Sequence, residues 1–86
     1  MPANYELVVA RSAEKDVKRI SQPNLKRILD KIARLSVDPR PSDCAKLTGN
    51  PFYRIRQGDW RVIYEVDDEK RRVTLLKIAH RREAYR

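Results

Sequence analysis

The sequence predicts an α+β fold of order β-α-α-β-β-β, with a helical hairpin packed on one face of a small antiparallel sheet. Two observations predict it. Apolar residues recur at helical spacing within the first 35 residues, and side-chain character alternates at strand spacing from residue 52 onward. A third observation is that the chain has no repeat, low-complexity tract or linker, which indicates one domain over residues 1–86.

The chain is expected to begin with a strand and a helix. Residues 5–10 favour a short strand that places Leu7 and Val9 on one face. Ser12 is a suitable N-cap for a helix over about residues 13–20, because its hydroxyl can accept a hydrogen bond from the first turn. That helix carries one apolar stripe at positions i, i+4 and i+7, formed by Ala13, Val17 and Ile20.

A second helix is expected from about Pro23 to Leu35, since proline is favoured in the first turn of a helix. The link between the two helices is short, so they should form an αα-hairpin. One face of the second helix is basic, and we interpret it as a solvated surface made of Lys26, Arg27, Lys31 and Arg34. The other face is predicted to be buried and consists of Leu25, Ile28, Leu29, Ile32 and Leu35.

The second half of the chain is expected to be a loop followed by three strands. Residues 37–43 contain two prolines and two aspartates and favour a loop, with residues 45–47 as its end or as a short strand. Residues 48–51 favour a turn, and strands are predicted over residues 52–56, 60–66 and 73–79. Short turns at Gly58-Asp59 and at residues 67–71 join these strands into an antiparallel meander.

Composition narrows the class of partner. The chain carries 20 Lys and Arg against 12 Asp and Glu, a formal net charge of +8. Such a charge favours nucleic acid first, an acidic protein second and an anionic membrane surface third. The membrane is the weakest of these, because no apolar run approaches the roughly 20 residues that span a bilayer. The N-terminus shows no signal-peptide pattern, so we expect a cytoplasmic protein.

The single cysteine limits the chemistry further. Cys44 cannot form an internal disulfide, which fits a reducing cytosol. Together with His80, the only histidine, it supplies too few ligands for a structural zinc site. We therefore expect no metal or other cofactor, and we interpret Cys44 as a small apolar filler in a loop.

Arginines recur along the predicted strands at the period of a strand. Arg54, Arg56 and Arg61 should project from the face of the sheet that the helices leave open, while Trp60 and Tyr64 pack in the core. Guanidinium groups recognise phosphate through paired hydrogen bonds, so this face favours RNA or another polyanion. The alternative interpretation is a solvated face that protects the sheet from edge pairing.

These segments resemble the RelE/ParE superfamily of bacterial and archaeal toxins, and the RelE branch more closely than ParE. The resemblance is carried by Lys46-Leu47-Thr48-Gly49, Tyr53-Arg54-Ile55-Arg56, the segment from Gly58 to Tyr64, and the segment from His80 to Tyr85. It implies a ribosome-dependent endoribonuclease that cuts mRNA in the A site. It also implies a two-gene operon with an antitoxin that wraps and neutralises the toxin.

The resemblance places the basic catalytic residues of the family on Arg54, Arg56, Arg61 and Arg81, and its C-terminal aromatic residue on Tyr85. The best-known member has lysines at the first two of these positions. Arginine holds phosphate but does not lose its proton at ordinary pH, so the general base is left unassigned.

The chemistry we expect is metal-free transesterification, in which the 2′-hydroxyl of the RNA attacks the adjacent phosphorus. Arg61 and Arg81 are expected to hold the scissile phosphate, and fixed guanidinium groups stabilise the charge that develops on it. Tyr85 either stacks on a base or acts as a proton acceptor. His80 is a possible acid or base, but on an extended segment it should point away from Arg81, which favours packing.

The expected partners follow from the same resemblance. They are an acidic, partly disordered antitoxin related to RelB, the 70S ribosome with its A-site mRNA, and operator DNA only indirectly through the antitoxin complex. Two alternatives remain: a ParE-like inhibitor of DNA gyrase, or a non-catalytic nucleic-acid-binding relative. Residues expected to contact RNA or the ribosome are Lys46, Arg71, Arg72, Arg82 and Arg86.

Overall fold

A computed structural model describes residues 4–84 of the chain, with side chains through residue 82. The predicted order β-α-α-β-β-β is found, with the short strand β2 before the meander and the helix α3 added at the end, and the α+β class is confirmed. The elements are β1 (Glu6–Val9), α1 (Arg11–Arg19), α2 (Asn24–Arg34), β2 (Ala45–Lys46), β3 (Phe52–Gln57), β4 (Trp60–Asp67), β5 (Arg72–His80) and α3 (Arg81–Ala84).

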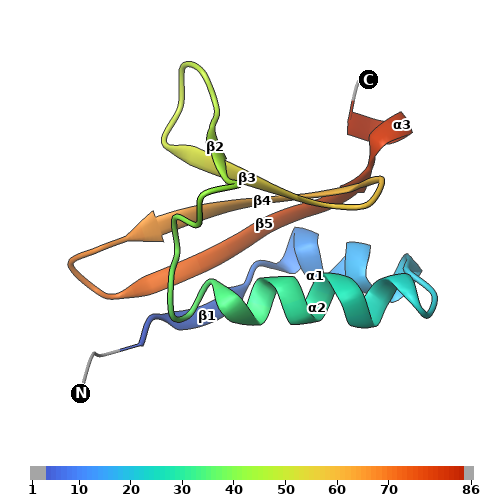
Figure 1. Cartoon of the computed structure of the whole chain (residues 1–86), viewed down its shortest axis with the longest axis horizontal. Coiled ribbons are helices and arrows are strands. Elements are labelled where there is room, and N and C mark those ends of the chain that lie inside the picture. Colours follow the sequence, from blue (N-terminus) through green and yellow to red (C-terminus); the bar gives the residue numbers. More distant parts are fainter. Residues whose placement is uncertain (1–3, 85–86) are drawn as a thin grey trace.

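The sheet is mixed, which corrects the expectation of an antiparallel sheet. Its strand order is β1-β5-β4-β3-β2. The meander of β3, β4 and β5 is antiparallel as predicted, but β1 pairs with β5 in parallel. The sequence around β1 does not show which strand it will join, because its neighbour lies some 65 residues further along (Glu6 pairs with Arg72). In Figure 1, α1 and α2 lie beneath the sheet and α3 lies above it.

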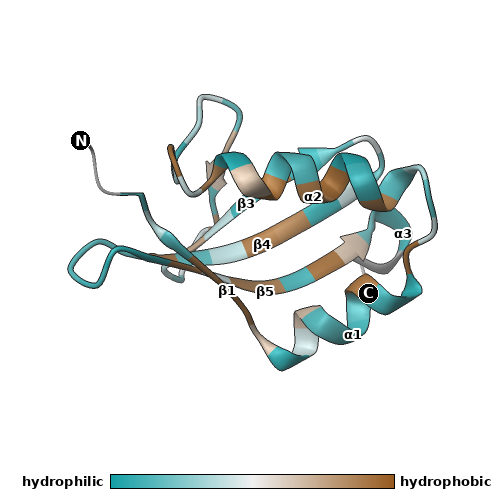
Figure 2. Cartoon of the chain, turned by 90° about the horizontal axis from the view of Figure 1, so that it is seen from below, coloured by the Kyte–Doolittle hydropathy of each residue, from teal (hydrophilic) through white to brown (hydrophobic). Residues whose placement is uncertain are grey.

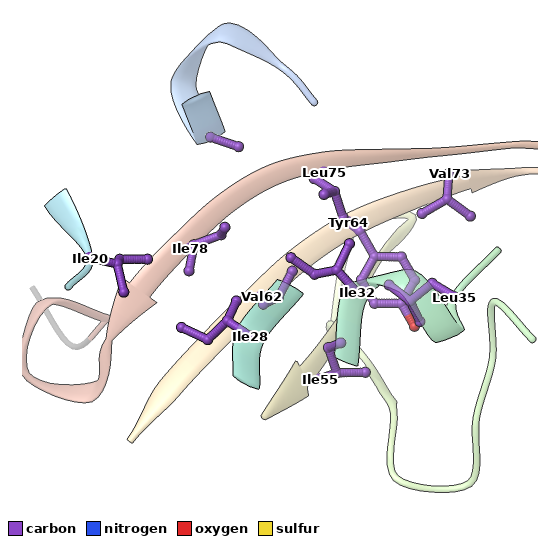
Figure 3. Close-up of a cluster of buried hydrophobic side chains, with 11 residues drawn as sticks. Ile20, Ile28, Ile32, Leu35, Ile55, Val62, Tyr64, Val73, Leu75 and Ile78 are labelled. Carbon is purple, nitrogen blue, oxygen red and sulfur yellow. The ribbon is translucent and has the colours of Figure 1, made fainter. Parts of the chain in front are cut away.

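The core lies between the sheet and the two long helices. Figure 3 shows Ile28 and Ile32 of α2, and Leu35 directly after this helix, pointing toward Val62 and Tyr64 of β4. The helices alternate apolar and polar segments in Figure 2, whereas the turn between β4 and β5 is polar throughout. The other sheet residues of the core are Ile55, Val73, Leu75 and Ile78.

Leu29 departs from the predicted buried stripe, since 43% of the residue's surface is exposed. The buried positions of α2 are Ile28 and Ile32, four residues apart on one face. Leu29 follows Ile28 by one position, which rotates it about 100° around the helix and toward solvent. Helical spacing predicted a wider apolar face on α2 than the sheet buries.

Helix α1 seals the edge of β5, and this overturns the predicted N-cap. The helix begins at Arg11, so Ser12 lies inside its first turn and makes no cap. The Ser12 hydroxyl donates instead to the carbonyl of Leu76 (2.6 Å), and Asp16 accepts from the amide of Ile78 (2.9 Å). Pairing with β1 stops at Leu75, so α1 satisfies backbone groups that β1 does not reach.

The turn between β3 and β4 sets the register of the arginine-bearing strands. Gln57 pairs with Trp60, leaving Gly58 and Asp59 as a two-residue turn. Gly58 has a φ of +60°, a conformation that glycine adopts without strain and that the first central position of a type II′ turn requires. The predicted hairpin is confirmed, and its register places Arg56 directly opposite Arg61.

The C-terminal segment is not extended beyond His80, contrary to the prediction. β5 ends there and Arg81 begins the short helix α3. The amide of Arg81 donates to the carbonyl of Asp59 (2.7 Å), which ties the start of α3 to the β3–β4 turn. The expectation that His80 and Arg81 point to opposite faces assumed an extended segment. Because the strand ends at His80, strand alternation does not determine the direction of the Arg81 side chain. Tyr85 and Arg86 lie outside the described residues.

At the end of the sheet formed by the β4–β5 turn, a hydrogen-bonded network is centred on Arg40 and Asp68. Arg40 donates to both carboxylate oxygens of Asp68 (3.2 and 2.8 Å) and to the hydroxyl of Tyr53 (3.0 Å). Tyr5 donates to Asp68 as well (2.6 Å). The hydrogen bonds from Arg40 and then Tyr5 lower the pKa of Asp68 to about 2.

This network predicts a defined acid dependence of stability. A lowered native pKa means that Asp68 stabilises the fold above its unfolded-state pKa of about 4 and loses this effect as pH falls toward about 2. We expect the difference in unfolding free energy between wild type and Asp68→Asn to be constant above about pH 5 and to shrink below pH 4. Urea titrations from pH 7 to pH 2 measure it, and a difference that does not change with pH would contradict the assignment.

Candidate functional site

Three arginines line one cleft at the end of the sheet. At this end the β3–β4 turn lies next to the start of α3 (Figure 1). The cleft has a volume of about 180 Å³. Arg56 comes from the end of β3, Arg61 from the start of β4 and Arg81 from the start of α3. Gly58 and Asp59 of the turn complete the lining. Three of the four arginines predicted as catalytic thus lie in one cleft, although they come from three elements.

Arg56 and Arg61 are cross-strand partners on the open face of the sheet. Like charges directly opposite each other in a sheet destabilise it, and arginine does not relieve the repulsion by losing its proton. Ala79, the β5 partner of Arg61, is small and buried, so it adds no bulk beside the arginines. Two positive charges at paired positions make this part of the sheet suited to a bound anion.

Asp59 is the acidic member of the cleft, and the sequence had assigned it only to the turn. One of its carboxylate oxygens lies 3.8 Å from a terminal nitrogen of the Arg81 guanidinium. Both side chains are about two-thirds exposed (66% for Arg81 and 62% for Asp59), so this ion pair contributes at most about 1 kcal/mol. A guanidinium held this weakly remains able to turn toward a phosphate.

A second, more open hollow adjoins the cleft and shares Asp59 and Arg81 with it. Its remaining lining comes from His80 and Arg82. The His80 ring packs edge-on against Trp60, with ring centroids 5.2 Å apart, and its Nδ1 accepts from the amide of Arg82 (3.3 Å). His80 thus packs against a neighbouring strand and caps the first turn of α3.

Other predicted site residues lie apart from the cleft. Arg54 shares the open face with Arg56, one residue pair further along β3. Lys46 pairs with Tyr53, which places it on the sheet face opposite to Arg54. Arg71 and Arg72 lie at the start of β5, roughly 25 Å from its other end, where Arg71 stacks over Tyr5 (5.5 Å) and Arg72 pairs with Glu6 (3.0 Å).

The basic face of α2 is solvent-exposed as predicted, apart from Lys31. Arg27 and Arg34 border a hollow of about 240 Å³ that Gln57 of β3 closes on one side. Lys31 forms an ion pair with Asp43, and its hydrogen bond lowers the pKa of that carboxyl. The negative charges of Asp30 and Asp43 therefore offset part of the positive charge on this face.

Three further observations concern metal binding, Cys44 and the membrane. Within residues 4–84, no three side chains of His, Cys, Asp or Glu come close enough to hold a metal ion. Cys44 is partly buried and packs against the core, consistent with a filler role. No helix among the described residues has both the length and the apolar character needed to cross a membrane.

Comparison with known protein families gives a match over nearly the whole chain. The family described as "ParE toxin of type II toxin-antitoxin system, parDE" matches residues 7–85. A candidate toxin of Methanocaldococcus jannaschii, named RelE1, is 31% identical over 86 residues, which cover 95% of this chain and 96% of the relative.

Solved structures with a similar fold carry related names. The RelE–RelB complex of the archaeon Pyrococcus horikoshii gives a TM-score of 0.80 at 28% identity and covers 91% of this chain and 96% of that one. The intact RelBE toxin–antitoxin complex of E. coli gives 0.78 at 25% identity, covering 88% and 95%. The RelB–RelE complex of Methanococcus jannaschii gives 0.75 at 26% identity, covering 91% and 94%.

Proposed function

This chain belongs to the RelE/ParE family of type II toxin–antitoxin toxins, and we propose that it inhibits translation by cutting mRNA in the A site of the ribosome. The observation that supports this most is the cleft in which Arg56, Arg61 and Arg81 converge. One toxin domain over residues 1–86 carries the activity, and the ribosome as target makes it a cytoplasmic endoribonuclease.

The proposed reaction is a transesterification within the RNA. The 2′-oxygen loses its proton and bonds to the adjacent phosphorus, while the bond from phosphorus to the 5′-oxygen breaks and that oxygen gains a proton. Negative charge develops on the phosphoryl oxygens in the transition state. Guanidinium groups already fixed around the phosphate stabilise this charge, which is often the largest single contribution to catalysis.

Each arginine has a distinct place in this proposal. Arg61 and Arg81 hold the scissile phosphate from opposite sides of the cleft, with Arg81 nearer the leaving 5′-oxygen. Arg56 and Arg54 bind the RNA backbone along the open face of β3, and Arg82 contacts it from the adjoining hollow. Tyr85, which follows α3 in the sequence, stacks on a base or acts as a proton acceptor.

The proposed partners fit the charge of the chain. An excess of positive charge, +8 in total, favours docking on ribosomal RNA, to which Lys46, Arg71, Arg72 and Arg86 contribute. An antitoxin related to RelB, with an acidic and partly disordered segment, neutralises the toxin. RelB accompanies RelE in the complexes from Pyrococcus horikoshii and E. coli. Operator DNA is contacted only through that antitoxin complex.

We expect the purified protein to cut end-labelled mRNA on programmed ribosomes, and only within the A-site codon. The same mRNA without ribosomes should stay intact, because the cleft offers few acid–base groups and the ribosome must orient the substrate. Primer extension maps the cuts to single nucleotides. Cuts spread along the message, or cuts that need no ribosome, would argue against this function.

The ParE name of the matching family favours a second candidate function, inhibition of DNA gyrase. In that case the arginine face would bind a protein or DNA surface and would cut nothing. A gyrase supercoiling assay decides between the two when a folded, antitoxin-free sample leaves programmed mRNA intact. Inhibition of supercoiling would then establish the second candidate, and a lack of inhibition would leave a non-catalytic nucleic-acid-binding relative.

A further inference from the structure

We propose that Asp59 is the general base of the cleft and takes the proton from the attacking 2′-hydroxyl, an inference that rests on the proposed function. Arginine cannot serve as this base, because its guanidinium stays protonated at ordinary pH. Of the five lining residues within the described part of the chain, three are arginines and one is a glycine. Among the lining residues that the structure describes, Asp59 is the one whose side chain can accept a proton.

The position of Asp59 suits this step. Its carboxylate lies 3.8 Å from the Arg81 guanidinium, and Arg81 is also the group that holds the scissile phosphate in the proposed reaction. In RNA the 2′-oxygen is adjacent to the phosphorus that it attacks. A phosphate bound to Arg81 therefore brings the 2′-hydroxyl toward the carboxylate, within the reach that proton transfer requires.

The backbone holds Asp59 in place independently of its side chain. Its carbonyl accepts from the amide of Arg81 (2.7 Å), and Gly58 fixes the turn in front of it. The carboxylate itself is 62% exposed and has Arg81 as its ion-pair partner. Side-chain substitutions at this position therefore keep the backbone link between the turn and α3, and they change mainly the chemistry of the cleft.

The full step balances without another reagent. The Asp59 carboxylate takes the 2′-hydroxyl proton as the bond from the 2′-oxygen to phosphorus forms. The bond to the 5′-oxygen breaks, and that oxygen takes a proton from water. The products are a 2′,3′-cyclic phosphate and a free 5′-hydroxyl, and Asp59 returns its proton to solvent. The arginines stabilise charge throughout and transfer no proton.

Asp59→Asn tests the proposal because it keeps the shape of the side chain and removes its basicity. In single-turnover cleavage on programmed ribosomes, we expect the rate to fall about 100-fold or more. Binding to the programmed ribosome, measured by filter retention, should not weaken, because a negative charge has been lost. Glu69→Gln is the matched control: it removes one negative charge at the exposed β4–β5 turn, far from the cleft, and should cut like wild type.

Two further variants separate a base from a residue that only positions Arg81. Asp59→Glu keeps a carboxylate and should retain part of the activity. Asp59→Ala should regain activity when formate is added, because a free carboxylate can replace the missing base but cannot replace a tether to Arg81. Cleavage by Asp59→Asn at the wild-type rate, or the absence of any formate rescue, would overturn the proposal. Failure of the wild type to cut would instead overturn the proposed function.

Discussion

Replacing Arg61 with alanine is expected to reduce A-site cleavage by on the order of 100-fold or more, which is the usual cost of removing one fixed donor to a developing oxyanion. Arg61 lies on β4 between its cross-strand neighbours Arg56 and Ala79 and lines the cleft with Arg81. In the proposed reaction its guanidinium acts in the transition state, so the loss should appear in the single-turnover rate at saturating protein and not only in binding.

Two controls make this prediction specific. Lys77 is exposed and lies on β5, the strand next to β4, outside the cleft. Lys77→Ala also removes one positive charge, and its cleavage rate should stay within a few-fold of wild type. Arg61→Lys keeps the charge but loses the planar pair of donors, so it should fall between wild type and Arg61→Ala. Equal losses in Lys77→Ala and Arg61→Ala would mean that the assay reports general attraction to RNA and not a catalytic contact.

The same substitution should leave the fold intact. Arg56 and Arg61 face each other across β3 and β4, so removing one of them relieves a like-charge contact that destabilises a sheet by up to about 1 kcal/mol. A marked drop in the melting temperature of Arg61→Ala would therefore show that this side chain is structural. Arg61→Ala is therefore expected to lower activity without lowering stability, as is common where a functional site brings like charges together.

Much of the arginine site could be predicted from the sequence because its information is local. The two-residue turn at Gly58-Asp59 fixes the register of β3 and β4, and the alternation of a strand then decides that Arg56 and Arg61 share a face. The same alternation assigned Trp60 and Tyr64 to the opposite face, where Tyr64 is fully buried.

The remaining parts depend on contacts between distant segments. The parallel pairing of β1 with β5 joins residues that no local pattern relates. The end of β5 at His80 is set by hydrogen bonds to the β3–β4 turn and within α3, so the direction of Arg81 did not follow from strand alternation. Asp59 reads locally as a turn residue, and its place in the cleft appears only when α3 folds back onto that turn.

Ile55→Ala should lower the free energy of unfolding by about 2–5 kcal/mol, the usual cost of emptying a buried isoleucine position. Ile55 is 1% exposed and lies on β3 between Arg54 and Arg56, with its side chain in the core (Figure 3). For a domain of this size, each kcal/mol corresponds to roughly 4–8 °C, so the melting temperature should fall by at least about 8 °C. Urea and thermal unfolding measure the loss.

Ile63→Ala is the matched control for this substitution, because Ile63 faces the open side of β4 as the partner of Arg54 and is only partly buried. It should lose clearly less stability than Ile55→Ala, and equal losses would contradict the assignment of the two sheet faces. At a temperature where Ile55→Ala is still folded, the Ile55→Ala variant should cut the same A-site positions as wild type. Ile55 maintains the strand that carries Arg54 and Arg56, whereas the proposed chemistry depends on the arginines themselves. Stability is therefore expected to fall without a change in where the RNA is cut.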